Sequence, residues 1–307
     1  MKPLVSVRVI TYNHEKYIAK CLEGILIQKT NFDYEIIVGE DCSTDKTREI
    51  VWDYQKRYPD IIRVITSEKN VGSIQNGRRV ERACQGAYHA ICEGDDFWID
   101  PLKLQRQVDF LEANPDYSMC CHDAISIWEN KVSYPRYSCP NDFPETLTAE
   151  DIILRPEVIQ TASMVIRSEV SRSLNAQDQE WRDKIWCGDT LIKLWALRAG
   201  KIKYIDEIMS IYRRHGQGLS ITIRDDMQQE ESVVEFLYRK FDEETNHQYS
   251  PIVEQIIEIN RNRYNYTRMR IKYGSLAFIL CPDKTLKKVR EVLDFIKQSR
   301  GNVKTFV

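Results

Sequence analysis

The sequence lacks the features that would place it inside a membrane or in the secretory pathway. No run approaches the roughly 18 apolar residues that a transmembrane helix needs. The start, MKPLVSVRVITYN, turns directly into a strand-like pattern without a hydrophobic segment and a small-residue cleavage site, so we expect no signal peptide. These absences predict a cytoplasmic protein, and the inner face of the membrane is the alternative location.

Cysteine pairs are also missing. The nine cysteines form an odd set, and none belongs to a CxxC motif. Several lie within apolar runs, which favours reduced thiols packed in a core over disulfides or a zinc site. Cys120, Cys121 and His122 resemble a metal site, but adjacent residues on a strand point to opposite faces. We therefore expect packing thiols there.

Two glycine-rich phosphate-binding motifs are absent. The chain has no GxGxxG after its first apolar run and no GxxxxGK[ST] anywhere. Nucleotide sites of the dehydrogenase and P-loop types are thereby excluded. Any phosphates that this chain binds would have to be held by carboxylates together with a divalent cation.

The chain is long enough to bury a large core. It has 307 residues, of which 42% are apolar, and this favours one sizeable domain with an appendage. We expect the domain to cover residues 1–222 and a helical C-terminal region to cover 223–307.

The C-terminal region is divided by charge. Residues 224–258 hold three basic and ten acidic side chains, whereas 259–307 hold twelve basic and three acidic ones. Opposite charges on neighbouring helices favour pairing within the chain or with another subunit. We expect homo-oligomerisation through these helices first, packing alone second, and peripheral membrane contact third.

Strands and helices alternate along the first part of the chain. The spacing of apolar residues predicts strands over 4–10, 34–39, 61–66 and 88–92, and helices over 14–28 (with Asn13 as N-cap), 44–57 and 74–85. This alternation predicts an α/β fold with a parallel sheet covered by helices on both faces. Farther along we expect two strands over 117–135, a surface loop over 135–145, a helix capped by Thr148, a strand over 161–167, and helices over 224–245, 251–272 and 283–299.

Ligands of such open sheets bind at the carboxyl ends of the strands. The residues that follow the predicted strands are Thr11 and Tyr12, Glu40 and Asp41, and Glu93, Asp95 and Asp96. Carboxylates so close together raise each other's proton affinity unless a cation or hydrogen-bond donors compensate. A solvated turn capping the next helix is the structural alternative, but three strand ends together favour a nucleoside diphosphate bound with a divalent ion.

Four motifs, in this order and spacing, resemble the nucleotide-binding half of family 2 glycosyltransferases of the GT-A fold: VSVRVITYN, EDCSTDKT, NVGS and CEGDDFW. The resemblance covers about the first 220 residues. It implies a GT-A (Rossmann-like) nucleotide-binding sheet flanked by helices, with a C-terminal helical appendage. It further implies a metal-dependent, hexosyltransferase-like enzyme that inverts configuration, with a UDP-sugar as the favoured donor.

The resemblance also implies contacts to the donor. Thr11 and Tyr12 would flank the base, Asp41 would accept a hydrogen bond from the imide nitrogen of the base, and Asp95 would lie beside the ribose. Each contact is carried over from the family's motifs to the matching positions of this sequence.

The metal ligand that the resemblance implies is Asp96, with Mn²⁺ or Mg²⁺ as the ion. Glu93, where the family pattern varies, receives a supporting role. The stretch IYRRHGQG resembles the family's closing loop, which implies that His215 completes the metal shell or touches the diphosphate. Arg213 and Arg214 alternate in direction on a strand end, so we expect one of them to neutralise the diphosphate.

A further acid, Asp189, lies in the stretch IWCGDTL. As structure, it would be a first-turn acid favoured by the helix dipole. The resemblance implies the base that accepts the proton of the acceptor hydroxyl, a role worth roughly 10²- to 10⁴-fold in rate. The family often carries a second acid where this chain has Gly188. The choice between Asp189 and a neighbour such as Asp183 therefore stays open.

The acceptor is expected to be a saccharide or a lipid-linked molecule, in surface polysaccharide or glycan biosynthesis, and we expect no nucleic-acid partner. Two other functions remain open. In the first, the chain is a catalytically silent module that binds nucleotide sugars, and Gly188 in place of the family's second acid is the sequence feature that suggests it. In the second, the chain binds a polyanion or a membrane surface through its basic tail.

Overall fold

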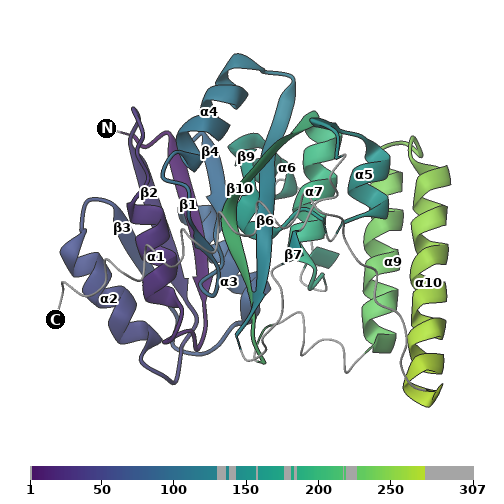
Figure 1. Cartoon of the computed structure of the whole chain (residues 1–307), viewed down its shortest axis with the longest axis horizontal. Coiled ribbons are helices and arrows are strands. Elements are labelled where there is room, and N and C mark those ends of the chain that lie inside the picture. Colours follow the sequence, from purple (N-terminus) through teal and green to yellow (C-terminus); the bar gives the residue numbers. More distant parts are fainter. Residues whose placement is uncertain are drawn as a thin grey trace. The chain divides into compact units, whose positions relative to one another are not determined.

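The computed structural model describes residues 2–129, 136–137, 143–156, 158–175, 181–182, 185–216, 218 and 227–273. The chain divides into a first compact unit, Met1–Asn262, and a second unit, Arg263–Val307. The first unit has the α/β fold that the sequence predicted, with a central sheet between helices (Figure 1). The described part of the second unit continues a helix, α10, to Tyr273.

The elements follow one another in this order: β1 (Val5–Thr11), α1 (Ile18–Leu26), β2 (Tyr34–Glu40), α2 (Thr47–Arg57), β3 (Ile62–Thr66), α3 (Gly72–Ala83), β4 (Tyr88–Ile91), β5 (Phe97–Trp98), α4 (Lys103–Ala113), β6 (Tyr117–Trp128), β7 (Arg136–Tyr137), β8 (Thr146–Leu147), α5 (Ala149–Leu154), the 3₁₀ turn η1 (Thr161–Ser163), β9 (Val165–Arg167), α6 (Ser168–Asn175), α7 (Gly188–Ala199), β10 (Lys201–Arg214), α9 (Met227–Glu244) and α10 (Ser250–Tyr273).

The sheet is mixed. Among the described residues it has ten strands, of which eight form the path β3-β2-β1-β4-β9-β6-β10-β5, while β7 pairs with β6 and β8 with β10. Strands β1 to β4 run parallel, as predicted from the alternation of strand and helix. Strand β9 is antiparallel to both β4 and β6, and β5 is antiparallel to β10. Strands β6 and β10 also pair in parallel, so the prediction of a parallel sheet holds for β1 to β4 and for this pair, and fails at β5, β7, β8 and β9.

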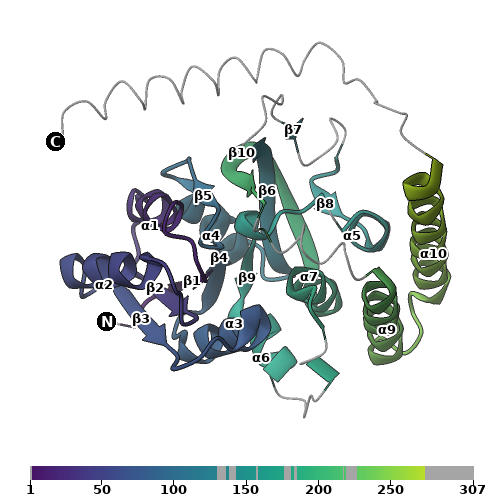
Figure 2. The same ribbon diagram turned by 90° about the horizontal axis from the view of Figure 1, so that it is seen from below.

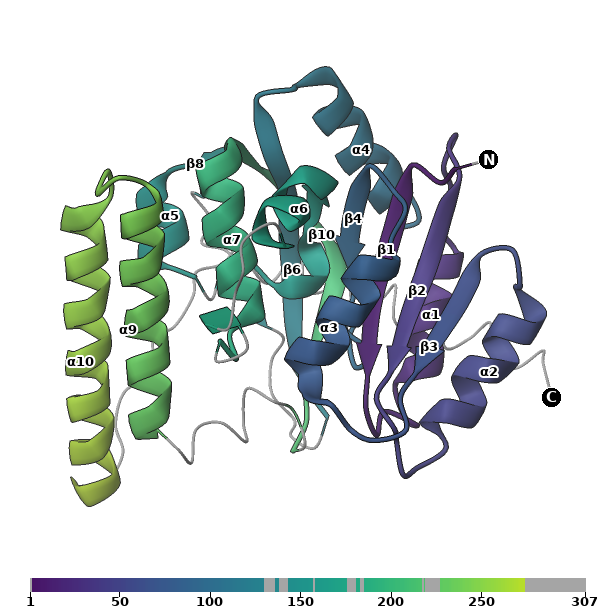
Figure 3. The ribbon, with the colours of Figure 1, turned by 180° about the vertical axis from the view of Figure 1, so that it is seen from behind.

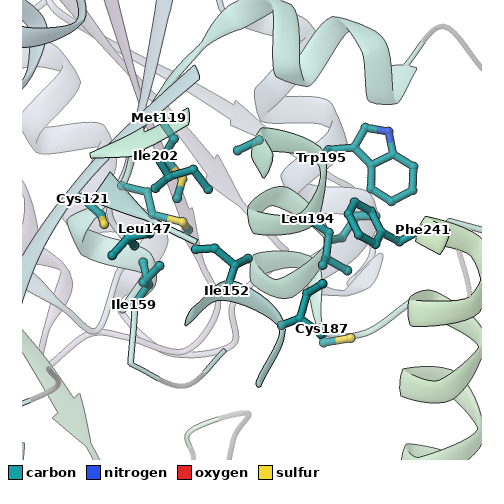
Figure 4. Close-up of a cluster of buried hydrophobic side chains, with 14 of the residues drawn as sticks. Met119, Cys121, Leu147, Ile152, Ile159, Cys187, Leu194, Trp195, Ile202 and Phe241 are labelled. Atoms are coloured by element: carbon teal, nitrogen blue, oxygen red, sulfur yellow. The ribbon is translucent and has the colours of Figure 1, made fainter. Parts of the chain in front are cut away.

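Helices cover both faces of the sheet. Helices α1 and α4 lie on one face, and α3, α6 and α7 lie on the other (Figures 2 and 3). One apolar cluster joins β1 and β2 to α1 and α4, with Leu22 and Leu104 fully buried. A second cluster surrounds α7, where Leu194 and Trp195 meet Phe241 of α9 (Figure 4). Both clusters consist of buried side chains. The loops at the ends of the strands are therefore anchored on well-packed helices and strands.

Helix α9 belongs to the packed core of the first unit. Its Leu237, Tyr238 and Phe241 are buried in the cluster around α7. Glu235 of α9 accepts two hydrogen bonds of 2.8 Å from Arg261 of α10. In this part of the chain the opposite charges of the two helices therefore pair with each other. The expected boundary between 222 and 223, and oligomerisation through these helices, remain predictions.

Several element boundaries differ from those expected. Residues 117–128 form one long strand, β6, in place of the first of two shorter ones, and residues 161–163 form a 3₁₀ turn before β9. Helix α1 begins at Ile18 because Asn13 adopts a left-handed conformation (φ 54°) and bonds to Ser43 and Thr44 instead of capping a helix. The predicted cap at Thr148 is confirmed as a capping box with Asp151.

Some expectations concern residues outside the described part: the helix over 283–299, most of the loop over 135–145, and most of the basic tail. Within the described residues, no helix is both long and apolar enough to cross a membrane. The seven cysteines that the structure describes all carry free thiols, as the sequence predicted.

Candidate active site

The carboxyl ends of β1, β2 and β4 meet at one edge of the sheet. Thr11 pairs with Glu40 at the ends of their strands, and the Gly94 amide donates a 3.0 Å hydrogen bond to the Ile10 carbonyl. The loop after β4 thus lies directly on the end of β1. A Cβ at Gly94 would come within 2.8 Å of Thr11 Oγ1 and 2.9 Å of His14 Nδ1, so only glycine permits this approach.

Asp41 is buried and fixes the loop before α3. Its Oδ1 accepts a hydrogen bond from the Val71 amide and its Oδ2 accepts one from the Gly72 amide, each at 2.9 Å. Ser67 Oγ also donates to Oδ1, at 3.2 Å. Tyr12 follows Thr11, whose carbonyl accepts a 3.1 Å hydrogen bond from the Asp41 amide, and 40% of its surface is exposed. Contacts of Asp41 and Tyr12 with a nucleotide base remain predictions.

Three side chains gather where the loop after β4 meets the end of β10. His14, Asp95 and His215 each offer one ligand atom, and these atoms all lie within 4.8 Å of one another. His215 Nε2 lies 3.0 Å from Asp95 Oδ2. His14 Nδ1 is buried without a hydrogen-bond partner among the described residues. This group is the candidate metal centre.

The electrostatics of the candidate metal centre suit metal binding. Burial, the largest effect, lowers the pKa of His14, which favours the neutral imidazole. Burial opposes the charged form of Asp95, but the hydrogen bond with His215 and the neighbouring His14 outweigh it and lower the pKa of Asp95. Neutral imidazoles and an ionised carboxylate are the forms in which these side chains bind a metal.

Asp96 lies outside this group. It is 1% exposed, and its Oδ1 accepts a 2.8 Å hydrogen bond from the amide of Arg213. Burial, followed by the charges of Asp95 and Glu93, raises the pKa of Asp96 well above its usual value. The resemblance implied Asp96 as the partner of His215 at the metal, whereas the structure brings Asp95 together with His215. The role of Asp96 as a ligand stays a prediction.

The two arginines at the end of β10 have different neighbours. Arg213 Nε donates a 2.8 Å hydrogen bond to the Asp95 carbonyl, and its guanidinium lies 4.8 Å from the centre of the Tyr17 ring. The guanidinium of Arg214 lies over Trp128, at 5.5 Å. Arg213 is therefore the arginine beside the acidic loop.

Asp189 stands in the first turn of α7. Lys193, one turn later, donates a 2.8 Å hydrogen bond to Asp189 Oδ2, and 37% of the Asp189 side chain is exposed. Burial works against the charged form of Asp189, but the charge and hydrogen bond of Lys193 outweigh it and lower the pKa of Asp189. The carboxylate is thus ionised and partly accessible.

Glu93 connects the two ends of the site. Burial, together with the charges of Asp95 and Asp189, raises the pKa of Glu93 to about 8. Glu93 therefore lies within electrostatic range of both the candidate metal centre and α7. The site has an arrangement suited to chemistry on a bound anion, with ligands at one end and an ionised acid at the other.

Comparison with known families gives a match over the first part of the chain. Residues 6–170, more than half of the chain, match the family described as glycosyl transferase family 2. The chain belongs to glycosyl transferase family 2. This membership confirms the resemblance drawn from the four motifs.

Individual relatives align with this chain over a longer stretch than residues 6–170. The putative teichuronic acid biosynthesis glycosyltransferase TuaG of Bacillus subtilis is 39% identical over 227 residues, which cover 71% of this chain and 82% of TuaG. Uncharacterised relatives from Mycobacterium are 34% identical over 221 residues. That alignment covers 70% of this chain and 60% of the length of those relatives.

Solved structures show the same GT-A fold. Staphylococcus aureus TarS 1–349, in complex with UDP-GlcNAc, has a TM-score of 0.63 at 18% identity and covers 90% of this chain and 77% of that one. The mannosyltransferase PcManGT of Pyrobaculum calidifontis, in complex with GDP-Man and Mn²⁺, has a TM-score of 0.57 at 15% identity and covers 98% and 83%.

Two residues of this family 2 site were not predicted from the sequence. His14 follows the first strand directly, so the rule that ligands bind at strand ends would have found it, but it was assigned to a helix. Lys193 lies four residues after Asp189, on the same face of the helix, and this spacing is the signal for it. Asp183, the alternative base, lies outside the described residues.

Cys42 stands where the family 2 pattern usually has glycine. Its φ is 59°, in the left-handed region that costs a residue with a Cβ roughly 1–2 kcal/mol. We expect Cys42→Gly to raise the free energy of unfolding by about 0.5–1 kcal/mol, measured by chemical denaturation, because glycine removes this strain at some cost in chain entropy. Cys42→Ala keeps the strain and serves as control. Equal stability of the two variants would contradict the prediction.

Proposed function

We propose that this chain is an inverting, metal-dependent glycosyltransferase that transfers a sugar from a nucleoside diphosphate sugar, with UDP as the favoured nucleotide, to an acceptor hydroxyl. Family membership supports the reaction class, and the crystallised TarS, which binds UDP-GlcNAc, supports the donor class. The observation that carries the proposal is the pairing of the His14, Asp95 and His215 group with an ionised Asp189, both within electrostatic range of Glu93.

The residues present fit a divalent cation. His14 Nδ1 is a buried nitrogen without a partner among the described residues, and it faces a carboxylate and a second imidazole. Two imidazoles with one carboxylate suit Mn²⁺ better than Mg²⁺, which prefers oxygen ligands and water. Mn²⁺ held by His14, Asp95 and His215 would offset the negative charge of the diphosphate. The mannosyltransferase structure with Mn²⁺ supports this choice of ion.

The protein's own groups account for the rest of the reaction. The Asp189 carboxylate would accept the proton of the acceptor hydroxyl while the hydroxyl oxygen attacks the anomeric carbon. The bond from that carbon to the diphosphate breaks on the opposite face, and its electron pair leaves with the diphosphate. Configuration at the anomeric carbon is therefore inverted. Arg213, held beside Asp95, would offset charge on the leaving diphosphate.

One relative supports a class of acceptor. TuaG is described as acting in teichuronic acid biosynthesis, which supports an acceptor that is a saccharide or a lipid-linked glycan in surface polysaccharide assembly. We assign catalysis to residues 1–222, and packing, oligomerisation or contact with a membrane surface to residues 223–307. The paired charges of Glu235 and Arg261 support packing as one part of this role.

The proposal is tested by donor turnover. The protein is incubated with Mn²⁺, a mixed oligosaccharide acceptor pool, and a panel of UDP-, GDP- and dTDP-linked sugars. Released nucleoside diphosphate is measured, and the anomeric configuration of the product is read by proton NMR. We expect release from a UDP-sugar, with inversion. Retention of configuration would contradict the inverting mechanism, and donor binding without any turnover would favour a silent binding module.

A further inference from the structure

Lys193 is a buried cation next to the proposed base. Its side chain is 1% exposed, and its Nζ donates hydrogen bonds to Asp189 Oδ2 at 2.8 Å and to the Pro156 carbonyl at 2.7 Å. A buried ammonium is costly unless it is paired and hydrogen-bonded. The position of Nζ is therefore fixed by two acceptors that belong to different segments of the chain.

The ion pair is asymmetric in exposure. More than a third of the Asp189 side chain is accessible, whereas its partner Lys193, on the same helix, is buried. Ion pairs four residues apart on exposed helix faces contribute little and change conformation readily. Here Lys193 is buried and also bonded to Pro156, so it holds one carboxylate oxygen of Asp189 while part of that side chain stays accessible.

The Lys193 ammonium also favours the charged form of Asp189. Burial works against that form, and the charge and hydrogen bond of Lys193 outweigh it, so the pKa of Asp189 is lowered. Glu93, in the loop after β4, lies within electrostatic range of both Asp189 and Lys193. The cation thus acts directly on the one acid that must accept a proton.

We propose that Lys193 is the positioning residue of the catalytic base, which holds the Asp189 carboxylate in one orientation and in its charged form. The inference rests on the proposed function, because it assigns Lys193 a role through Asp189. A merely structural role, in which Lys193 ties α7 to Pro156, predicts a change in stability and no change in the pH dependence of turnover.

The test compares Lys193→Met with Lys103→Met. Lys103 is also a fully buried lysine on a helix, and its Nζ donates a 2.7 Å hydrogen bond to Gln107, so it controls for the loss of a buried lysine side chain. The pH dependence of kcat is measured from the release of UDP with Mn²⁺ and the UDP-sugar that the panel identifies. The base works when deprotonated, so turnover falls as pH drops through its pKa.

For Lys193→Met we expect kcat at neutral pH to fall roughly 10- to 100-fold, because the base is no longer oriented. The acidic limb of the profile should move to higher pH by about one unit or more, since a nearby cation that lowered the pKa has gone. Lys193→Arg, which keeps the charge, should keep the limb where it is, and Lys103→Met should leave kcat and the limb unchanged. A wild-type profile for Lys193→Met would overturn the inference.

Two further measurements separate this inference from the proposed function. In an Asp189→Asn background, Lys193→Met should cause no additional loss of rate, because both residues act through one carboxylate. If Asp189→Asn itself is active, the proposed base is wrong; if it is inactive while Lys193→Met behaves as wild type, only the role of Lys193 is wrong. The pKa of Asp189, read by carboxyl ¹³C NMR, should rise in Lys193→Met, and an unchanged pKa contradicts the inference even without a turnover assay.

Discussion

Asp189→Asn is expected to lower the turnover of the donor by roughly 10²- to 10⁴-fold while leaving donor affinity nearly unchanged. An alcohol is too weak an acid to ionise near neutral pH, so its proton must pass to a positioned carboxylate as the new bond forms. Asparagine keeps the size of the side chain and one acceptor oxygen for Lys193 but cannot accept that proton. The measurement is kcat for UDP release, with donor affinity determined by calorimetry on the same samples.

The control for this substitution is Glu150→Gln. Glu150 is an exposed acid in the first turn of α5, the same helical position that Asp189 has in α7, and it lies outside the site. The Glu150→Gln substitution should leave kcat unchanged. A near-normal rate for Asp189→Asn would transfer the role of base to a neighbour such as Asp183, and loss of donor binding together with turnover would show that Asp189 acts in binding.

Asp95→Ala is expected to weaken Mn²⁺ binding by at least about 10²-fold, since the loss of outer partners alone costs 10- to 100-fold at metal sites. The substitution removes the single carboxylate of the His14, Asp95 and His215 group and leaves its two imidazoles. Mn²⁺ affinity is measured by electron paramagnetic resonance without donor, so the result does not depend on activity. Donor binding in the presence of Mn²⁺ should weaken in parallel.

Substitutions of two other aspartates serve as a control and as a test of the alternative metal ligand. Asp53→Ala changes an exposed aspartate on α2, paired with Arg57, and should leave Mn²⁺ affinity unchanged. Asp96→Ala distinguishes the geometry of the structure from the assignment implied by the motifs. If Asp96→Ala abolishes Mn²⁺ binding and Asp95→Ala does not, the metal centre that the structure brings together is not the one that binds.

The first half of the fold was predictable because its signals are local. Strands β1 to β4 are apolar runs separated by helical periodicity, and their parallel order follows from the alternation of the two. The reversal at β9 was not predictable, because it depends on the pairing of residues 165–167 with β4 and β6 across long stretches of sequence. No local pattern in three residues specifies the direction in which they will pair.

The candidate site was predictable as a location but not as a set of contacts. The strand ends and the family's motifs led to Asp41, Asp95, Asp96 and His215, which the structure places at the ends of β2, β4 and β10. Which of two adjacent acids meets His215 was not predictable. That choice depends on the Arg213 amide, which engages Asp96 and leaves Asp95 beside the imidazole.

The sequence did not predict that His14 and Lys193 belong to the candidate site, and the physical reasons differ. The left-handed conformation of Asn13 delays the start of α1, and this releases His14 to the edge of the sheet. Lysine is rarely enclosed unless it is paired, so a lysine in an amphipathic pattern is normally assigned to the exposed face of a helix. The core around α7 encloses Lys193 because Asp189 and the Pro156 carbonyl supply its partners.

The proposed function requires the site to bind a nucleoside diphosphate sugar together with a divalent cation. The decisive experiment is calorimetric titration of the donor panel into the wild-type protein, once with Mn²⁺ and once after its removal by EDTA. We predict that at least one UDP-sugar binds with Mn²⁺ and loses most of its affinity with EDTA. If no donor binds in either condition, or if binding is the same in both, the claim is contradicted, and the basic tail over 259–307 becomes the functional surface to test.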